Sequence, residues 1–293
     1  MNTIGGQAVI EGVMMKSRNG WSVAVRGMDG KIHLRKESLK DRNKLLRTPI
    51  VRGVIALYDA FSIGIKALEF SANKAYEGEE QKPMSRHLLV FTIAVALMLG
   101  VGLFILFPLY ATKLLGIAFH SVSENTVMFN LVDGLIRVFV FLVYIGAIGL
   151  WPEMKRILQY HGAEHKVIHA YEAGRMLKPE GLSDMSTHHP RCGTSFLLIV
   201  MVVSIAVFSF IPQSWHFFYK FLSRVIFIPV IAGLSYELLR FSSKRKDNVV
   251  IRFLVMPGLA LQRLTTREPD ELQVEVAIKA LEEVLSLEVK DAR

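Results

Sequence analysis

The chain has 293 residues, of which 52% are hydrophobic and 21% are charged, and its formal net charge is +9. This composition excludes an intrinsically disordered chain and is not that of an ordinary soluble protein. Nucleic-acid binding is a poor explanation of the positive charge, because the sequence contains no basic module with interleaved aromatic residues. Cys192 is the only cysteine, which excludes an intrachain disulfide and fits a reducing compartment.

Residues 1–87 are expected to form a cytoplasmic region with a small sheet and an amphipathic helix. Residues 21–26 and 31–35 alternate between polar and apolar side chains, and an Asp-Gly pair between them suits a tight turn. Residues 49–76 have apolar side chains at helical spacing and charged residues on the other side. The sequence therefore predicts a hairpin, then a helix that lies along the membrane or packs on a helix bundle.

Residues 88–240 are expected to form a membrane bundle. Residues 88–110 and 192–219 carry no charge, and each stretch is as long as the roughly 20 apolar residues that a spanning helix requires. A buried core helix is the alternative, but cores rarely need uninterrupted apolar runs of this length.

Two weaker segments complete the predicted bundle. Residues 131–151 can span a membrane only by including Asp133 and Arg137, which are one helical turn apart and could neutralise each other. Residues 221–240 have an uncharged centre of only residues 225–236. The alternative for each of these two segments is an interfacial or re-entrant position. The predicted fold class is a mainly α, polytopic membrane protein with about four transmembrane helices and a cytoplasmic α+β portion.

The distribution of charge predicts the orientation. Lysine and arginine are concentrated in residues 1–87 and 241–293, whereas the connectors at 111–130 and 213–220 contain one lysine each. With four spans, both ends of the chain and the 152–194 segment share one side, which the positive-inside rule makes cytoplasmic. We therefore expect a multi-pass protein of the bacterial cell membrane, with the lipid bilayer as its partner and an attraction to anionic lipid. The C-terminal region, 241–293, is expected to contain an amphipathic helix at residues 270–289.

A metal site is indicated by the sequence HGAEH at residues 161–165, in a helix predicted from Pro152 to about Ala173. His161 and His165 are one turn apart, so both imidazoles can point at one ion. Zinc or a related divalent ion accepts such a pair, and Glu164 lies between them in the order that inverted zinc proteases use for a general base. The competing interpretation is a set of polar residues on a solvated helix.

A second cluster of possible ligands follows in a polar loop. His189 and Cys192 could supply the ligands that one helical turn cannot, while substrate contact and a purely structural loop are the alternatives. His169 lies about 12 Å from His161 along the helix axis, at 1.5 Å per residue. A supporting or substrate-binding role therefore suits His169 better than a place in the same metal site.

Four short blocks occur in one order along the chain: GGQAVIEGVMM at residues 5–15, HGAEHK at 161–166, HPRCGT at 189–194 and PGLALQ at 257–262. Together they resemble the bacterial YqhQ-like membrane family, and the resemblance covers nearly the whole chain. It implies a bacterial membrane protein and, where the family carries a functional label, a metal-dependent enzyme; it implies no substrate. Glu11, within the first block, is either a further ligand or base, or a turn carboxylate.

The residues favour a metal-dependent hydrolase at the cytoplasmic face of the membrane. The ion, zinc or a related divalent metal, would be held by His161 and His165. His189, alone or together with Cys192, would complete a site that keeps one position for water, and Glu164 would take the proton of that water molecule. The predicted ligands are His161, His165, His189 and Cys192. The alternative is a non-enzymatic membrane metal-binding protein, which would be a transporter, a sensor or a scaffold stapled by its metal. Peptide, lipid-linked and soluble substrates all fit these residues.

Overall fold

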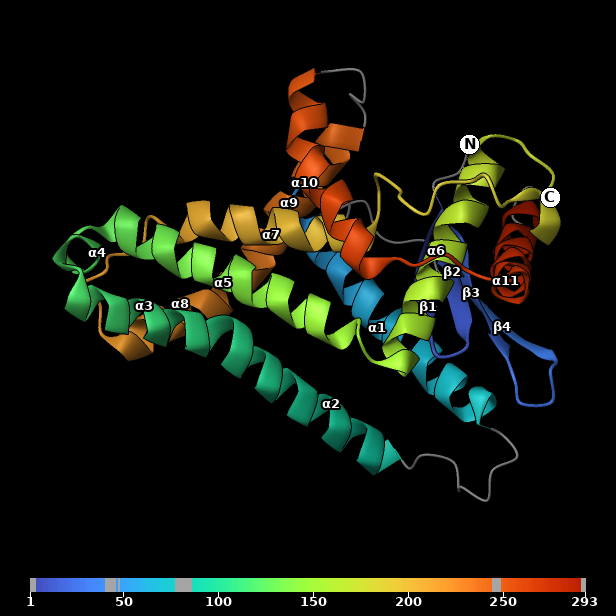
Figure 1. Cartoon of the computed structure of the whole chain (residues 1–293), viewed down its shortest axis with the longest axis horizontal. Helices are drawn as coiled ribbons and strands as arrows, with labels where there is room; N and C mark the ends of the chain where they lie inside the picture. The colour runs from blue at the N-terminus through green and yellow to red at the C-terminus, as the bar shows by residue number, and fades with distance from the viewer. Residues whose placement is uncertain (1–3, 40–45, 47, 77–85, 244–248, 291–293) are drawn as a thin grey trace.

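The computed structural model describes the chain except for residues 1–3, 40–45, 47, 77–85, 244–248 and 291–293. The described part is mainly helical and contains one four-stranded antiparallel sheet near the N-terminus. The predicted combination of a helical chain with a small N-terminal sheet is therefore confirmed. In Figure 1 the sheet lies at one end of the long axis together with α6 and α11, and the apolar helices extend toward the other end.

The sheet consists of β1 (Gly5–Val9), β2 (Gly12–Lys16), β3 (Gly20–Arg26) and β4 (Ile32–Ser38), in that spatial order. The hairpin of β3 and β4 is the one predicted from alternation. Its turn contains Gly30, which has a φ of 75° that favours glycine. The first two strands, joined by the two-residue loop at positions 10–11, extend the sheet to four strands.

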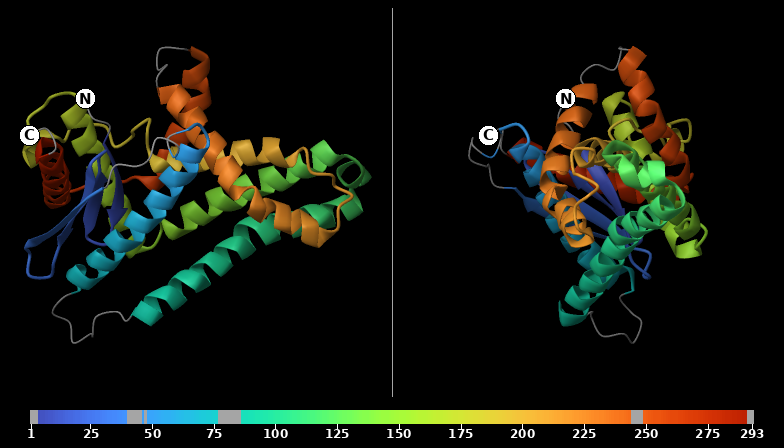
Figure 2. Two further views of the ribbon diagram at one scale, coloured as in Figure 1. Left: turned by 180° about the vertical axis from the view of Figure 1, so that it is seen from behind. Right: turned by 90° about the vertical axis from the view of Figure 1, so that its left-hand side faces the viewer.

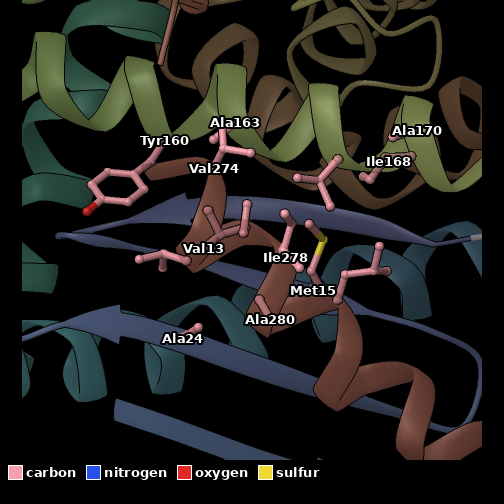
Figure 3. Packing of buried hydrophobic residues seen from close by; sticks show 14 of the residues in the cluster. Val13, Met15, Ala24, Tyr160, Ala163, Ile168, Ala170, Val274, Ile278 and Ala280 are labelled. Atoms are coloured by element: carbon pink, nitrogen blue, oxygen red, sulfur yellow. The ribbon is translucent and has the colours of Figure 1, made fainter. Parts of the chain in front are cut away.

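Alternating side chains bury both faces of the sheet, which forms the middle layer of three. One face packs on α6 (Pro152–Glu172) and α11 (Glu271–Lys290), and the other packs on α1 (Val51–Ala75). Figure 3 shows the first interface, in which Val13, Met15 and Ala24 lie against side chains of the two helices. On the opposite face Trp21 and Val23 are packed with residues of α1.

Segments far apart in the sequence make up this α+β unit. The Ser22 hydroxyl on β3 donates to the Ala280 carbonyl on α11 at 2.6 Å, across the buried interface. Figure 2 shows α1 between the sheet and the apolar helices, and α1 contacts both β3 and α9. The N-terminal region, the 152–194 segment and the C-terminal region, which the charge pattern predicts to share one side of a membrane, thus pack together.

A long apolar helix runs from Val90 to Ala118, through α2 (Arg86–Val101), a π-helical stretch (Gly102–Leu106) and α3 (Phe107–Ala118). Pro108 has no N–H to donate, and the π-helical turn before it adapts the helix to that missing hydrogen bond. Apolar side chains on α2 are exposed in many directions, among them Phe91 and Met98. Such a surface suits contact with lipid chains rather than water.

The remaining apolar helices differ in length. After the short α4 (His120–Glu124), α5 (Thr126–Ile148) is the second helix long and apolar enough to cross a membrane. α8 (Phe217–Ile226) and α9 (Ile228–Ser243) qualify only as a pair that is bent by 45°, and Pro229 lies just after the bend. α7 (Gly193–Phe208) is apolar but has 16 residues. The described residues thus contain two potential spans, or three if the bent pair is one span; four would require α7 as well.

Charged side chains inside the bundle are paired with one another. The Arg137 guanidinium donates to Asp133 Oδ2 at 2.7 Å, as the i, i+4 spacing predicts. Arg224, on α8, donates to the same oxygen at 3.3 Å and to Asn130 Oδ1 at 2.8 Å. These contacts tie α5 to α8 and reduce the cost of burying the charges.

α10 (Val249–Thr265) brings the chain back to α7, and its last residue, Thr265, contacts His161 of α6. A Cβ added at Gly258 would lie 2.9 Å from the Ser195 hydroxyl, so glycine permits the close approach of α10 to α7. The connector to α11 then crosses α6, where a Cβ at Gly162 would lie 2.0 Å from the Arg267 carbonyl oxygen. Glycine at position 162 therefore lets this connector lie directly against the helix that carries the HGAEH sequence.

Candidate metal centre

Two histidines and the only cysteine come together from elements that are distant in sequence. His161 and His165 lie one turn apart on α6, and Cys192 immediately precedes α7. One possible ligand atom from each residue lies within 4.8 Å of the other two. His161 Nε2 is 3.2 Å from Cys192 Sγ, and the two imidazole rings are 4.5 Å apart. The structure therefore gathers three of the four predicted ligands into one group.

Backbone carbonyl groups orient both imidazoles. His161 Nδ1 lies 2.6 Å from the Thr265 carbonyl oxygen, and His165 Nδ1 lies 2.5 Å from the Thr187 carbonyl oxygen. Because a carbonyl oxygen only accepts hydrogen bonds, each Nδ1 carries a proton, and in the neutral imidazole Nε2 is then the nitrogen with the lone pair. Metal-binding histidines are usually held in this way by a partner on the nitrogen that does not bind the metal.

Cys192 is placed at the N-terminus of a helix. Its Sγ accepts a hydrogen bond from the Thr194 amide at 3.4 Å and lies 3.1 Å from the Thr194 hydroxyl. The side chain is buried. Its sulfur is thus fixed by the first turn of α7, and sulfur is a ligand that zinc accepts.

His189, the fourth predicted ligand, is not a member of this group. Its Nδ1 accepts a hydrogen bond from the Arg191 amide at 3.3 Å, and its Nε2 is 3.5 Å from a Glu172 carboxylate oxygen. The ring lies 5.9 Å from that of His165. Gln262 accepts from the His189 amide at 2.7 Å and donates to its carbonyl at 2.8 Å, which seats the loop beside the cluster. Metal ligation by His189 stays a prediction.

The loop before α7 is anchored to α6. His169 Nε2 is 2.8 Å from the His188 carbonyl oxygen, and its ring lies 4.6 Å from that of His189. Lys166, which is buried, donates to the Ser183 carbonyl at 2.8 Å. A short 3-10 turn, Pro179–Gly181, precedes this anchored part of the loop. A supporting role was one of the two predicted for His169, and this contact is consistent with it.

Glu164 is buried beside the cluster and faces β1. Its side chain accepts a hydrogen bond from the Gly6 amide, while Oε2 has no partner among the described residues. A Cβ at Gly6 would lie 2.8 Å from two carbon atoms of the Glu164 side chain, so glycine permits this close approach. Burial raises the pKa of the Glu164 carboxyl to about 7, against the lowering effects of His161 and of the Gly6 amide. Glu164 is thus a buried acid–base group with one free oxygen.

A cavity of about 620 Å³ borders both Glu164 and His161. It lies between β1 and helices α1, α6, α7 and α9, and its walls are mainly apolar, with Leu57, Leu158 and Phe196 among them. Its size falls within the range of about 300–1,000 Å³ that is typical of ligand pockets. An acid–base group and a candidate metal ligand therefore share the wall of a largely apolar space.

Comparison with known proteins identifies the family. Residues 48–287 match the family described as "Protein of unknown function (DUF1385)". The chain belongs to the DUF1385 family. It is similar to the Bacillus subtilis (strain 168) protein described as "Uncharacterized protein YqhQ", with 36% identity over 299 residues that cover 97% of this chain and 92% of that protein. No solved structure matches the chain.

The extent of these matches bears on the site. The DUF1385 match includes α6, α7 and α10, which together carry or orient the cluster, whereas the four strands precede residue 48. The similarity to YqhQ covers nearly all of both chains and thus reaches the strands as well. The resemblance inferred from the four sequence blocks is confirmed.

Several residues of the site were not predicted. Thr265 and Thr187 act through backbone carbonyl groups, so their side chains give no signal in the sequence. Gln262 is the last residue of the PGLALQ block, but its contacts with the loop depend on how α10 packs. Glu11, considered as a ligand or base, instead accepts hydrogen bonds from Arg156 at 2.6 Å and from the Tyr160 hydroxyl at 3.1 Å. It is a turn carboxylate that ties the first hairpin to α6.

Proposed function

We propose that this protein is a metal-dependent hydrolase that acts at the cytoplasmic face of a membrane. The observation that carries the proposal is the group formed by His161, His165 and Cys192, with the carboxylate of Glu164 beside it, one oxygen of which has no hydrogen-bond partner among the described residues. Two imidazoles and one thiolate suit zinc or a related divalent ion. Three protein ligands leave one position of a tetrahedral site for water, as in catalytic zinc sites.

The roles of the side chains follow from their positions. His161, His165 and Cys192 would hold a divalent ion, which would supply Lewis-acid activation of a water molecule. Glu164 accepts the proton and later returns it to the leaving group. Because the imidazoles are already fixed by the Thr265 and Thr187 carbonyl groups, they need little reorganisation when the ion binds.

The coordination shell of the detergent-purified protein tests this function. We expect about one zinc or related ion per chain, with two nitrogen ligands, one sulfur ligand and one exchangeable oxygen at about 2.0–2.2 Å. Metal analysis gives the stoichiometry, and X-ray absorption spectroscopy gives the ligands. A closed shell of four protein ligands, with His189 as the fourth, would contradict the hydrolase and support a metal-stapled scaffold.

We further propose four spans with both ends of the chain in the cytoplasm, which makes α7 the third span and the bent α8–α9 pair the fourth. Support comes from the lysine and arginine pattern and from the apolar surfaces of these helices. α7 is about 24 Å long at 1.5 Å per residue, somewhat short of a bilayer core of about 30 Å. The uncharged residues 209–216 that follow would cover the remaining thickness.

Cysteine labelling in intact cells tests this orientation. We expect a membrane-impermeant maleimide to label the His120→Cys variant in intact cells, and to label Glu180→Cys only after lysis, because the two exposed positions lie on opposite sides. The wild-type protein is the control, since its single cysteine is buried. Labelling of both variants in intact cells would rule out the four-span arrangement.

A further inference from the structure

β1 is an edge strand whose outer side borders the cavity of the candidate metal centre. In the order β1-β2-β3-β4, and among the residues that the structure describes, it has a strand partner on one side only. Gly6, Gln7 and Ala8 line the same cavity as His161 and Glu164. An exposed strand edge is a template on which another extended chain can pair.

The register identifies the backbone groups that face outward. A two-residue loop joins Val9 to Gly12, so these residues form a hydrogen-bonded pair, and such pairs alternate along an antiparallel ladder. Gln7 belongs to the next pair of this kind. Gly6 and Ala8, which fall between, therefore direct their N–H and C=O groups away from β2 and toward the cavity side.

Of the backbone groups of Gly6 and Ala8 that face outward, one is bonded to Glu164 and the other three have no partner among the described residues. The Gly6 amide donates to Glu164, which independently agrees with the direction assigned by the register. Within the part of the chain that the structure describes, the Gly6 carbonyl and both backbone groups of Ala8 have no hydrogen-bond partner. An added strand would find these three groups free and would run past the Glu164 carboxylate.

The walls of the cavity select the side chains that such a strand could carry. Leu57 and Phe61 of α1 and Leu197 of α7 are apolar, and the latter two are 58% and 43% exposed. Phe61 also belongs to an exposed apolar row on α1 that includes Tyr58 and Leu68. The cavity thus opens beside surfaces suited to a membrane and accepts apolar groups.

We propose that the substrate is an apolar stretch of polypeptide, which binds as an added strand on β1 and is cleaved beside Glu164. This inference rests on the proposed hydrolase. Water adds to the peptide carbonyl carbon, the C–N bond breaks, and the proton taken by Glu164 passes to the leaving amine. About three substrate residues, or roughly 10 Å of strand, would face Gly6, Gln7 and Ala8. A lipid ester could use the apolar walls but would not need the free backbone groups of β1.

Substitution of Ala8 by proline distinguishes a polypeptide substrate that pairs with β1 from a lipid ester. Ala8→Pro removes the outward N–H, which an edge strand tolerates, and its ring obstructs pairing with an added strand. Leu34→Pro is the matched control, because Leu34 lies on β4 at the other edge of the sheet. The hydrogen bond from Gly27 N to Lys31 O sets the register there and directs the Leu34 N–H outward. Metal content should equal that of the wild type in both variants.

The zinc-loaded full-length protein in detergent is assayed with two probes: fluorescein-labelled casein, an unfolded polypeptide, and 4-methylumbelliferyl palmitate, a lipid-like ester. Binding of casein is followed by anisotropy, and cleavage by release of labelled fragments. We expect the wild type to bind and cleave casein, Ala8→Pro to lower binding and kcat/KM at least about tenfold, and Leu34→Pro to change neither.

Each other outcome has one meaning. Absence of casein binding, or binding that is indifferent to Ala8→Pro, overturns strand addition. Cleavage of the ester alone would then leave the hydrolase in place with a lipid substrate. Casein binding that depends on position 8 without cleavage of either probe would overturn the hydrolase and leave a peptide-binding metal protein.

Discussion

Replacing His161 and His165 together with alanine is expected to reduce bound metal from about one ion per chain to less than about a tenth. Two of the three gathered ligands are lost, and the Cys192 thiolate alone cannot hold a divalent ion against a chelating buffer. The measurement is metal content after dialysis of the detergent-purified variant. Circular dichroism checks that the helical content is unchanged.

Two comparisons make the result specific. His169→Ala removes an imidazole from the same helix, but its Nε2 faces the His188 carbonyl rather than the cluster, so we expect a much smaller loss of metal. Cys192→Ser keeps the size of the side chain while replacing sulfur with a poorer ligand, and it should weaken binding. Full metal content in the variant that lacks both histidines would rule out metal binding at this site.

The helical part of the site could be predicted because its signal is local. The spacing of His161 and His165 places both on one face of any α-helix, whatever surrounds it. The carbonyl groups of Thr265 and Thr187 could not be predicted, because they reach the imidazoles only after α10 and the loop have packed against α6. Backbone acceptors are the same for every residue type and leave no pattern in a sequence.

The membrane helices show a related limit. The charge-free stretch 192–219 satisfies the length criterion, but α7 ends at Phe208, before Pro212 and a run of turn residues. A stretch without charged residues shows how much of the sequence is apolar. The length of the helix within it also depends on where proline and capping residues end the backbone hydrogen bonds. For residues 131–151 the local signal was sufficient, because Asp133 and Arg137 lie one turn apart and do pair.

The contact between the first strand of the sheet and Glu164 could not be predicted from the sequence either. The alternation in residues 21–35 predicts the hairpin of β3 and β4, but the strand that meets Glu164 is β1. Its GGQAV sequence has little of the alternation that marks a strand. Gly6 is nevertheless informative once the fold is known, since any side chain there would collide with Glu164.

Glu164→Gln is expected to keep the metal and the fold while lowering turnover about 100- to 10,000-fold. Glutamine has nearly the same shape, and its amide oxygen can still accept the hydrogen bond from Gly6. It cannot take up the proton of an attacking water molecule, so the chemical step loses its general base. Turnover is measured with whichever of the two probes the wild type cleaves, and in cells by complementation of the gene deletion.

Glu153→Gln is the matched control, because it removes an exposed carboxylate from the first turn of the same helix, away from the cluster. We expect this variant to retain wild-type turnover. Normal turnover and complementation by Glu164→Gln would argue against general-base hydrolysis and favour metal binding without catalysis. Loss of metal in Glu164→Gln would have a different meaning: the free Oε2 would then be a fourth ligand rather than a base, and the proton acceptor would have to be another group on the cavity wall.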